Sequence, residues 1–129
     1  MDRGATIMLA DDDPVVLDSS SKALQAAGFK VVRAEDGCRA IEEALSRKVS
    51  LMVLDVSMRQ MGGVEVCHCM KAMPKTSKIP IVLTAHKKDP AAKTLARRTH
   101  GSVRVLRKPF EPEDLVSLVR DLAKPKSLI

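Results

Sequence analysis

Five polar residues that could act together each stand at or just beyond the end of a strand-like run in this sequence. They are Asp11, Asp12, Asp55, Thr84 and Lys108. The run at residues 51–54 has no polar alternation, which is typical of a strand buried on both faces in the middle of a parallel sheet. In open α/β sheets the ligand crevice lies outside the carboxyl ends of the strands. Asp55, which ends this run, is therefore the first candidate for a functional residue.

The types of these residues indicate one kind of chemistry. Three carboxylates brought together without a cation would repel one another and raise one another's pKa. A hard divalent cation relieves that repulsion, and Mg²⁺ suits oxygen ligands. Lys108 and the hydroxyl of Thr84 would add a positive charge and a hydrogen-bond donor, which the oxygens of a transferring phosphoryl group require. The set predicts a site for Mg²⁺ and phosphoryl transfer.

Five strand-like runs alternate with five helix-like segments and would position these residues. The expected strands are residues 6–10, a short strand from Val31, and residues 51–55, 79–84 and 103–106. The expected helices begin at Pro14 after the N-cap Asp13, at Gly37, after Gly63, at Pro90 after Asp89, and at Pro112. This alternation predicts an α/β fold with a parallel sheet covered on both faces, and its topology places the carboxyl ends of the strands at one edge.

Helical spacing also assigns side chains to the core. The inner face of the second helix is expected to hold Ile41, Ala44 and Leu45. In the third helix, Cys69 is expected to face the core and His68 to face water. The run Cys67-His68-Cys69 is not expected to bind a metal, because helical neighbours two apart point to nearly opposite sides.

Length and composition exclude several classes of protein. The 129 residues suit one domain, and 45% apolar with 29% charged residues is typical of globular proteins. No run is long enough to span a membrane and the start lacks the apolar core of a signal peptide, so we expect a cytoplasmic location and reduced cysteines. The absence of Trp and Tyr argues against an aromatic platform for single-stranded nucleic acid.

Four motifs together resemble the receiver domains of two-component response regulators, and of chemotaxis regulators among them. The motifs are Ala10-Asp11-Asp12-Asp13-Pro14, Leu54-Asp55, Thr84-Ala85 and Lys108-Pro109-Phe110. The resemblance covers essentially the whole chain. It implies a flavodoxin-like, doubly wound, five-stranded parallel sheet in the order 2-1-3-4-5 with five helices. Residues 1–129 would form a single receiver domain, with 124–129 as a frayed tail or the start of a linker.

The resemblance also implies roles for the site residues. Asp55 would accept a phosphoryl group from a histidine kinase or phosphotransfer protein as an acyl phosphate. Asp12 and Asp55 would bind Mg²⁺ directly, with the backbone carbonyl of Ser57 as a third ligand and Asp11 acting largely through water. Thr84 would turn its hydroxyl onto the phosphate. Asp13 is expected to be a helix cap rather than a ligand.

Lys108 would pair with the phosphate, and no other enzymatic activity is implied. Such a domain is not an enzyme with an external substrate, because it catalyses only its own phosphoryl transfer and slow autodephosphorylation. Ser57 and His86 stand two residues after Asp55 and Thr84, where side chains of the family tune autodephosphorylation. A solvated loop residue is the alternative interpretation of His86.

The sequence departs from the family pattern at three positions. Arg59 stands where the family usually has Pro, and Gly62 where Asp is frequent. Val105 stands where Tyr or Phe commonly couples the movement of the Thr to the output face. Because Val has no ring to swing, we expect the phosphorylated state to be signalled through the fourth helix and a loop rearrangement.

Basic residues are concentrated in residues 86–108, where Asp89 is the one acidic residue. They are Lys87, Lys88, Lys93, Arg97, Arg98, Arg104, Arg107 and Lys108. One interpretation is a solvated face; the other is a surface for an acidic protein partner or for dimerisation, steered by charge. Nucleic acid is the less favoured partner, since the chain has no recognition module.

Two hypotheses about function come from different classes. The first is a phosphoacceptor switch, and the second is a pseudo-receiver, an interaction module that acts without phosphorylation. The presence together of the five polar residues favours the first. A Mg²⁺-dependent phosphatase with an Asp nucleophile is disfavoured, because Ser57 stands where a second acid–base carboxylate would be needed.

Overall fold

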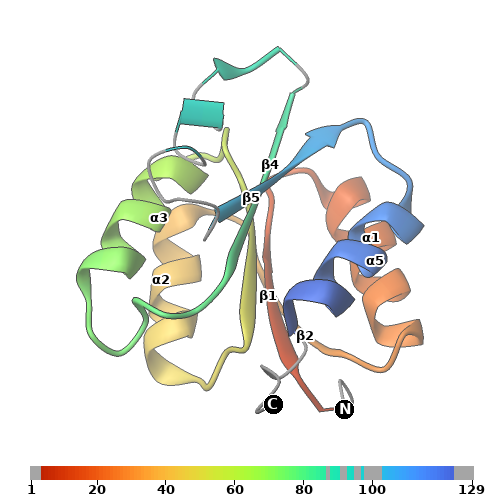
Figure 1. Cartoon of the computed structure of the whole chain (residues 1–129), viewed down its shortest axis with the longest axis horizontal. Helices are drawn as coiled ribbons and strands as arrows, with labels where there is room; N and C mark the ends of the chain where they lie inside the picture. Colours follow the sequence, from red (N-terminus) through yellow and green to blue (C-terminus); the bar gives the residue numbers. More distant parts are fainter. Residues whose placement is uncertain (1–3, 87, 91–92, 95–96, 98–102, 124–129) are drawn as a thin grey trace.

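A computed structural model of the chain describes residues 4–86, 88–90, 93–94, 97 and 103–123. The described part has five strands in one sheet, with helices on both faces (Figure 1). The elements are β1 (Thr6–Ala10), α1 (Pro14–Ala26), β2 (Lys30–Ala34), α2 (Gly37–Ser46), β3 (Leu51–Asp55), α3 (Gly63–Ala72), β4 (Ile81–His86), β5 (Val103–Lys108) and α5 (Pro112–Ala123).

The strands are all parallel and lie in the order β2-β1-β3-β4-β5. This confirms the expected flavodoxin-like α/β sheet and its strand order. β3 lies in the centre, and all five of its residues are buried. β4 and β5 each extend two residues beyond their expected ends, to His86 and Lys108. The two longer strands pair over their full length, from Ile81 with Val103 to His86 with Lys108.

Two hydrophobic cores cover the two faces of the sheet. One lies under α2 and α3 and contains Met52, Leu54, Val66 and Met70. The other lies under α1 and α5 and contains residues such as Leu24 and Leu115. Figure 1 shows α2 and α3 on one side of the sheet and α1 and α5 on the other. The sheet is therefore held between two helical layers, which fixes the positions of its strand ends.

Helix α1 begins as the sequence predicts. Asp13 is the N-cap, its side chain accepts the Val15 N–H at 3.0 Å, and Pro14 occupies the first turn. This arrangement satisfies one of the N–H groups that a helix start leaves without a partner. The helix start directly follows the end of β1, so the cap also fixes the backbone beside Asp11 and Asp12.

The number of helices differs from the expectation. The described residues contain four helices rather than five. The fourth helix was expected between Asp89 and Gly101, and most of that segment lies outside the described residues, as does the expected tail at 124–129. Within the described part of the chain, no helix has the length and apolarity needed to cross a membrane.

Two predicted core positions are wrong. Leu45 is 39% exposed, because the buried residues of α2 are Gly37, Ala40 and Ala44, and Leu45 lies beyond the edge of that stripe. In α3 the fully buried cysteine is Cys67, while Cys69 is only partly buried.

The stripe of α3 explains the difference between these two cysteines. It runs through Gly63, Val66, Cys67 and Met70, so Cys69 is turned away from its centre. Burial raises the pKa of the Cys67 thiol, which disfavours the thiolate that a metal would need. His68 is exposed, as predicted.

Candidate functional site

The predicted site residues meet at the carboxyl edge of the sheet. Asp11 follows β1, Asp55 ends β3, and Asp55 is in register with Thr84 of the neighbouring β4. The Val56 N–H donates to the Thr84 carbonyl at 2.9 Å, which continues the pairing beyond Asp55. Lys108 ends β5, the next strand. Residues that are 97 positions apart in the sequence, Asp11 and Lys108, are thus brought into contact.

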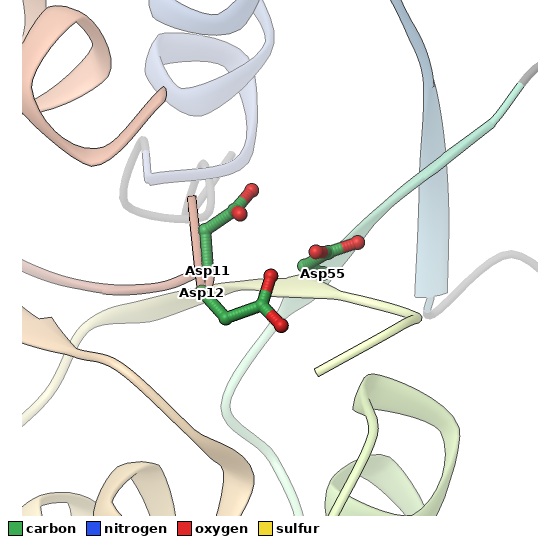
Figure 2. A group of neighbouring side chains, drawn as sticks. All are labelled: Asp11, Asp12 and Asp55. Carbon is green, nitrogen blue, oxygen red and sulfur yellow. The ribbon is translucent and has the colours of Figure 1, made fainter. Parts of the chain in front are cut away.

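Three carboxylates form a compact cluster at this edge. One oxygen from each of Asp11, Asp12 and Asp55 lies within 4.8 Å of the others. Figure 2 shows the three side chains side by side at the ends of β1 and β3. Asp11 is 1% and Asp55 is 6% exposed, whereas Asp12 is partly exposed. The cluster is therefore closed on the protein side and open to solvent at Asp12.

Lys108 contacts two of these carboxylates. Its Nζ lies 2.9 Å from Asp11 Oδ2 and 3.5 Å from Asp55 Oδ2. Asp11 also accepts the Asp13 N–H at 2.9 Å, and Asp55 Oδ1 accepts the Ser57 N–H at 3.3 Å. The carboxylates are thus oriented by one ammonium and by backbone donors, which leaves Lys108 as the single cation in contact with them among the described residues.

Lys108 neutralises the charge of the three carboxylates only in part. Burial raises the pKa of the Asp55 carboxyl and the charge of Asp11 raises it further, while Lys108 and the Ser57 N–H only partly oppose the rise. Burial alone would lower the pKa of Lys108. The hydrogen bond to Asp11 and the two carboxylate charges outweigh burial and raise it. A further positive charge at the cluster would favour the ionised form of Asp55.

The chain matches the family model of the response regulator receiver domain over residues 7–120. The match covers most of the 129 residues and includes all five polar residues of the site. The chain belongs to the receiver-domain family of response regulators.

Relatives of this receiver domain include longer regulators. It is 34% identical over 122 residues to the response regulator MprA of Mycobacterium ulcerans, covering 95% of this chain and 51% of that protein. It is 31% identical to the probable transcriptional regulatory protein TcrX of Mycobacterium tuberculosis, covering 92% of this chain and 50% of that protein. The receiver domain spans about half the length of these relatives.

Solved structures of similar proteins share the fold. The chemotaxis response regulator CheY4 of Vibrio cholerae superposes with a TM-score of 0.83 at 26% identity, covering 92% of this chain and 98% of that one. A putative response regulator from Chloroflexus aurantiacus gives 0.85 at 27% identity, covering 94% and 98%. The chemotaxis-like architecture expected from the motifs is confirmed.

The carboxylate cluster of this receiver domain fits a hard divalent cation. Its donors are all oxygens, three carboxylates face one ammonium, and burial and the charge of Asp11 raise the pKa of Asp55. Mg²⁺ accepts such ligands while retaining several waters, and the partly exposed Asp12 leaves room for them. The predicted contribution of the Ser57 backbone carbonyl stays a prediction.

Two glycines position the loop between Asp55 and α3. A Cβ at Gly63 would lie 2.6 Å from the Asp55 carbonyl oxygen, and one at Gly37 would lie 1.9 Å from the Met61 carbonyl oxygen. Nothing in the sequence marked the approach of Met61 to Gly37. Only a residue without a side chain lets α2 and α3 begin this close to the loop.

The remaining predicted residues surround the cluster in different ways. Thr84 is 2% exposed beside Asp55, and His86 is the exposed last residue of β4. Val105 is partly buried on β5. A pocket of about 340 Å³ opens beside Lys108, between α1 and the residues after β5, and Val16 and Phe110 line it. The pocket thus adjoins the cluster through Lys108, and none of the three carboxylates lines it.

The basic residues do not all belong to one exposed surface. Lys88, Lys93, Arg97 and Arg104 are exposed. Lys87 and Arg98 lie outside the described residues. Arg107 is half-buried, and its guanidinium donates to backbone carbonyls of this same chain. It is a residue whose contact the sequence did not indicate.

Proposed function

We propose that this receiver domain is the phosphoacceptor switch of a two-component or phosphorelay system. The observation that carries the proposal is the cluster of Asp11, Asp12 and Asp55 with Lys108 in contact with two of the three carboxylates. The donor would be a histidine kinase or a histidine phosphotransfer protein. The family supports such a partner, and the pocket beside Lys108 offers an apolar surface on which its helix could rest.

Asp55 is the proposed nucleophile. One of its oxygens attacks the phosphorus of the donor's phosphohistidine, an O–P bond forms, the N–P bond breaks, and the electron pair of that bond returns to the imidazole. The product is an acyl phosphate on Asp55. Attack by water at phosphorus would later release inorganic phosphate and restore the carboxylate. The chain would therefore catalyse only its own loading and slow unloading.

The other residues of the site stabilise charge. Asp11, Asp12 and Asp55, with the Ser57 carbonyl, would hold Mg²⁺, which when bound supplies the positive charge that draws phosphoryl oxygens toward the acceptor. Lys108 already lies 3.5 Å from Asp55 Oδ2 and can pair with a phosphoryl oxygen there. The Thr84 hydroxyl, in register with Asp55, can donate to another.

The exposed basic residues support a second partner surface. Lys88, Lys93, Arg97 and Arg104 are exposed and would attract an acidic protein surface. Arg107 contributes less to that surface because its guanidinium contacts this chain's own backbone. The chain spans about half the length of the regulators it matches. We therefore also propose, rather than observe, that a partner or a further domain carries the response to phosphorylation.

Intact-mass spectrometry tests the phosphoacceptor role. The chain is incubated with Mg²⁺ and acetyl phosphate, and in parallel with a phosphorylated histidine phosphotransfer protein. One added phosphoryl group is expected in the native chain and none in Asp55→Asn. Asp13→Asn is the matched control, because Asp13 is the neighbouring helix cap and should keep its labelling. No added mass from either donor would instead favour an interaction module without phosphorylation.

A further inference from the structure

Arg107 holds the loop that follows β4. Its Nη1 donates to the His86 carbonyl at 2.9 Å and to the Asp89 carbonyl at 2.6 Å. The same His86 carbonyl accepts the Asp89 N–H at 3.0 Å, which closes a turn. Hydrogen bonds from a charged donor are shorter and stronger than neutral ones. One side chain of β5 therefore holds the carbonyls of both His86 and Asp89.

Arg107 and Lys108 reach opposite sides of the sheet from adjacent positions on β5. Val105 belongs with the core under α2 and α3, and Leu106 with the core under α1 and α5. Because side chains alternate along a strand, Arg107 shares the face of Val105, and Lys108 shares the face of Leu106. The last two residues of β5 thus connect the carboxylates of the site to the loop after β4.

The loop that Arg107 holds leads away from the site residue Thr84. Thr84 and His86 lie on β4, which ends at His86, and the turn follows it. Asp89 precedes the exposed basic residues Lys93 and Arg97 in the sequence. Arg107 links the end of β5 to two backbone carbonyls at and after the end of β4, at the next position after Val105 on the same face.

We propose that Arg107 is a positioning residue that makes His86 and Asp89 move together with the end of β5. When a phosphoryl group on Asp55 draws Lys108, the adjacent Arg107 carries the His86 and Asp89 carbonyls with it. The movement of these carbonyls then transmits the state of Asp55 to the exposed basic residues such as Lys93 and Arg97. This inference rests on the proposed phosphoacceptor function and adds the route by which the loaded state leaves the site.

The first test uses the unmodified chain, so it does not depend on phosphorylation. Arg107→Met removes both hydrogen bonds of Nη1, and amide hydrogen exchange at Asp89 should speed up about tenfold, equivalent to about 1.4 kcal/mol of local opening. Arg104→Met removes an exposed arginine from the same strand and should leave this rate unchanged. If the Asp89 amide exchanged at the same rate in the native chain and in Arg107→Met, Arg107 would not hold the turn after β4.

The second test measures the response to phosphorylation. Amide chemical shifts are recorded before and after loading with acetyl phosphate and Mg²⁺, and intact mass confirms the loading of each sample. The shift changes at His86, Lys88 and Asp89 should fall to less than about half in Arg107→Met and recover in part in Arg107→Lys, which keeps one charged donor group.

The outcomes separate the two proposals. Loading of Arg107→Met with unchanged loop responses would overturn this inference and leave the phosphoacceptor function standing. Failure of the native chain to gain mass from either donor would overturn the phosphoacceptor function, and the reporting role of Arg107 with it. Normal loading with a reduced loop response supports both.

Discussion

Two loops leave the candidate site, and they are held in opposite ways. The loop after β3 is fixed by backbone packing: the Gly63 N–H donates to the Val56 carbonyl at 3.2 Å, and Gly37 leaves no room between α2 and Met61. The loop after β4 is held by the side chain of Arg107, and His86 and Lys88 within it are exposed. The first loop is thus fixed by its own backbone, whereas the position of His86 and Asp89 depends on one side chain from another strand.

The largest expected effect comes from crowding the first loop. In Gly37→Ala the new Cβ would lie 1.9 Å from the Met61 carbonyl oxygen, so α2 or the loop must shift. Overpacking of this kind costs about 3 kcal/mol of unfolding free energy. Arg107→Met should cost about 1 kcal/mol, because it removes hydrogen bonds at a partly exposed turn. Urea denaturation measures both.

A matched control keeps that comparison fair. Cys38→Ala changes the exposed neighbour of Gly37 on α2 and should shift the unfolding midpoint little. If Gly37→Ala were no more destabilising than Arg107→Met, the first loop would not be the more rigid of the two.

The carboxylate between the loops should make stability depend on pH. The folded pKa of Asp55 is raised, mainly by burial, so its protonated form favours folding below the ordinary pKa, and this contribution is lost as pH rises through the folded pKa. Asp55→Asn, which keeps an oxygen acceptor for the Ser57 N–H, should therefore be more stable than the native chain at pH 7. The difference should shrink toward pH 3.

Thermal unfolding across that pH range gives the measurement. Asp13→Asn serves as the control because Asp13 caps α1 outside the cluster. If the native chain became more stable relative to Asp55→Asn as pH rose, the charge of the Asp55 carboxylate would be better neutralised than its burial indicates.

Metal binding alone should also distinguish the two loops. Titration with Mg²⁺ should move the Ser57 amide resonance, since its N–H donates to a proposed ligand, more than the Asp89 amide. At about ten times the dissociation constant, Mg²⁺ should also add about 1.4 kcal/mol to the unfolding free energy. Asp55→Asn should lose most of both responses. Equal movement at Ser57 and Asp89 would mean that the metal already shifts the second loop.

The sequence predicted most of the site because its residues occupy the ends of buried runs. Asp11, Asp55 and Lys108 follow apolar runs, and parallel strands end at one edge, so their convergence could be predicted from the sequence. The ion pairs that Lys108 forms with Asp11 and Asp55 were not predicted. The helix cap at Asp13 was also predicted, because it depends only on neighbouring residues.

The missed features depend on contacts between distant segments. The clamp of Arg107 requires the path of the loop after β4, and the role of Gly37 requires the approach of Met61. Cys67 and Cys69 lie on different sides of the short helix α3. The sequence pattern did not show which of the two faces the core. The departure Val105 was visible in the sequence, but the link that the structure offers in its place was not.

The strand order has a consequence for how copies of this domain meet. Among the described residues, it leaves β2 and β5 as the edges of the sheet, each with a strand on one side only. Each edge carries an exposed cation, Lys30 on β2 and Arg104 on β5. Charged residues on edge strands oppose the pairing of one sheet with another, because the cations would have to be brought together. Pairing of two copies through β2 or β5 is therefore disfavoured.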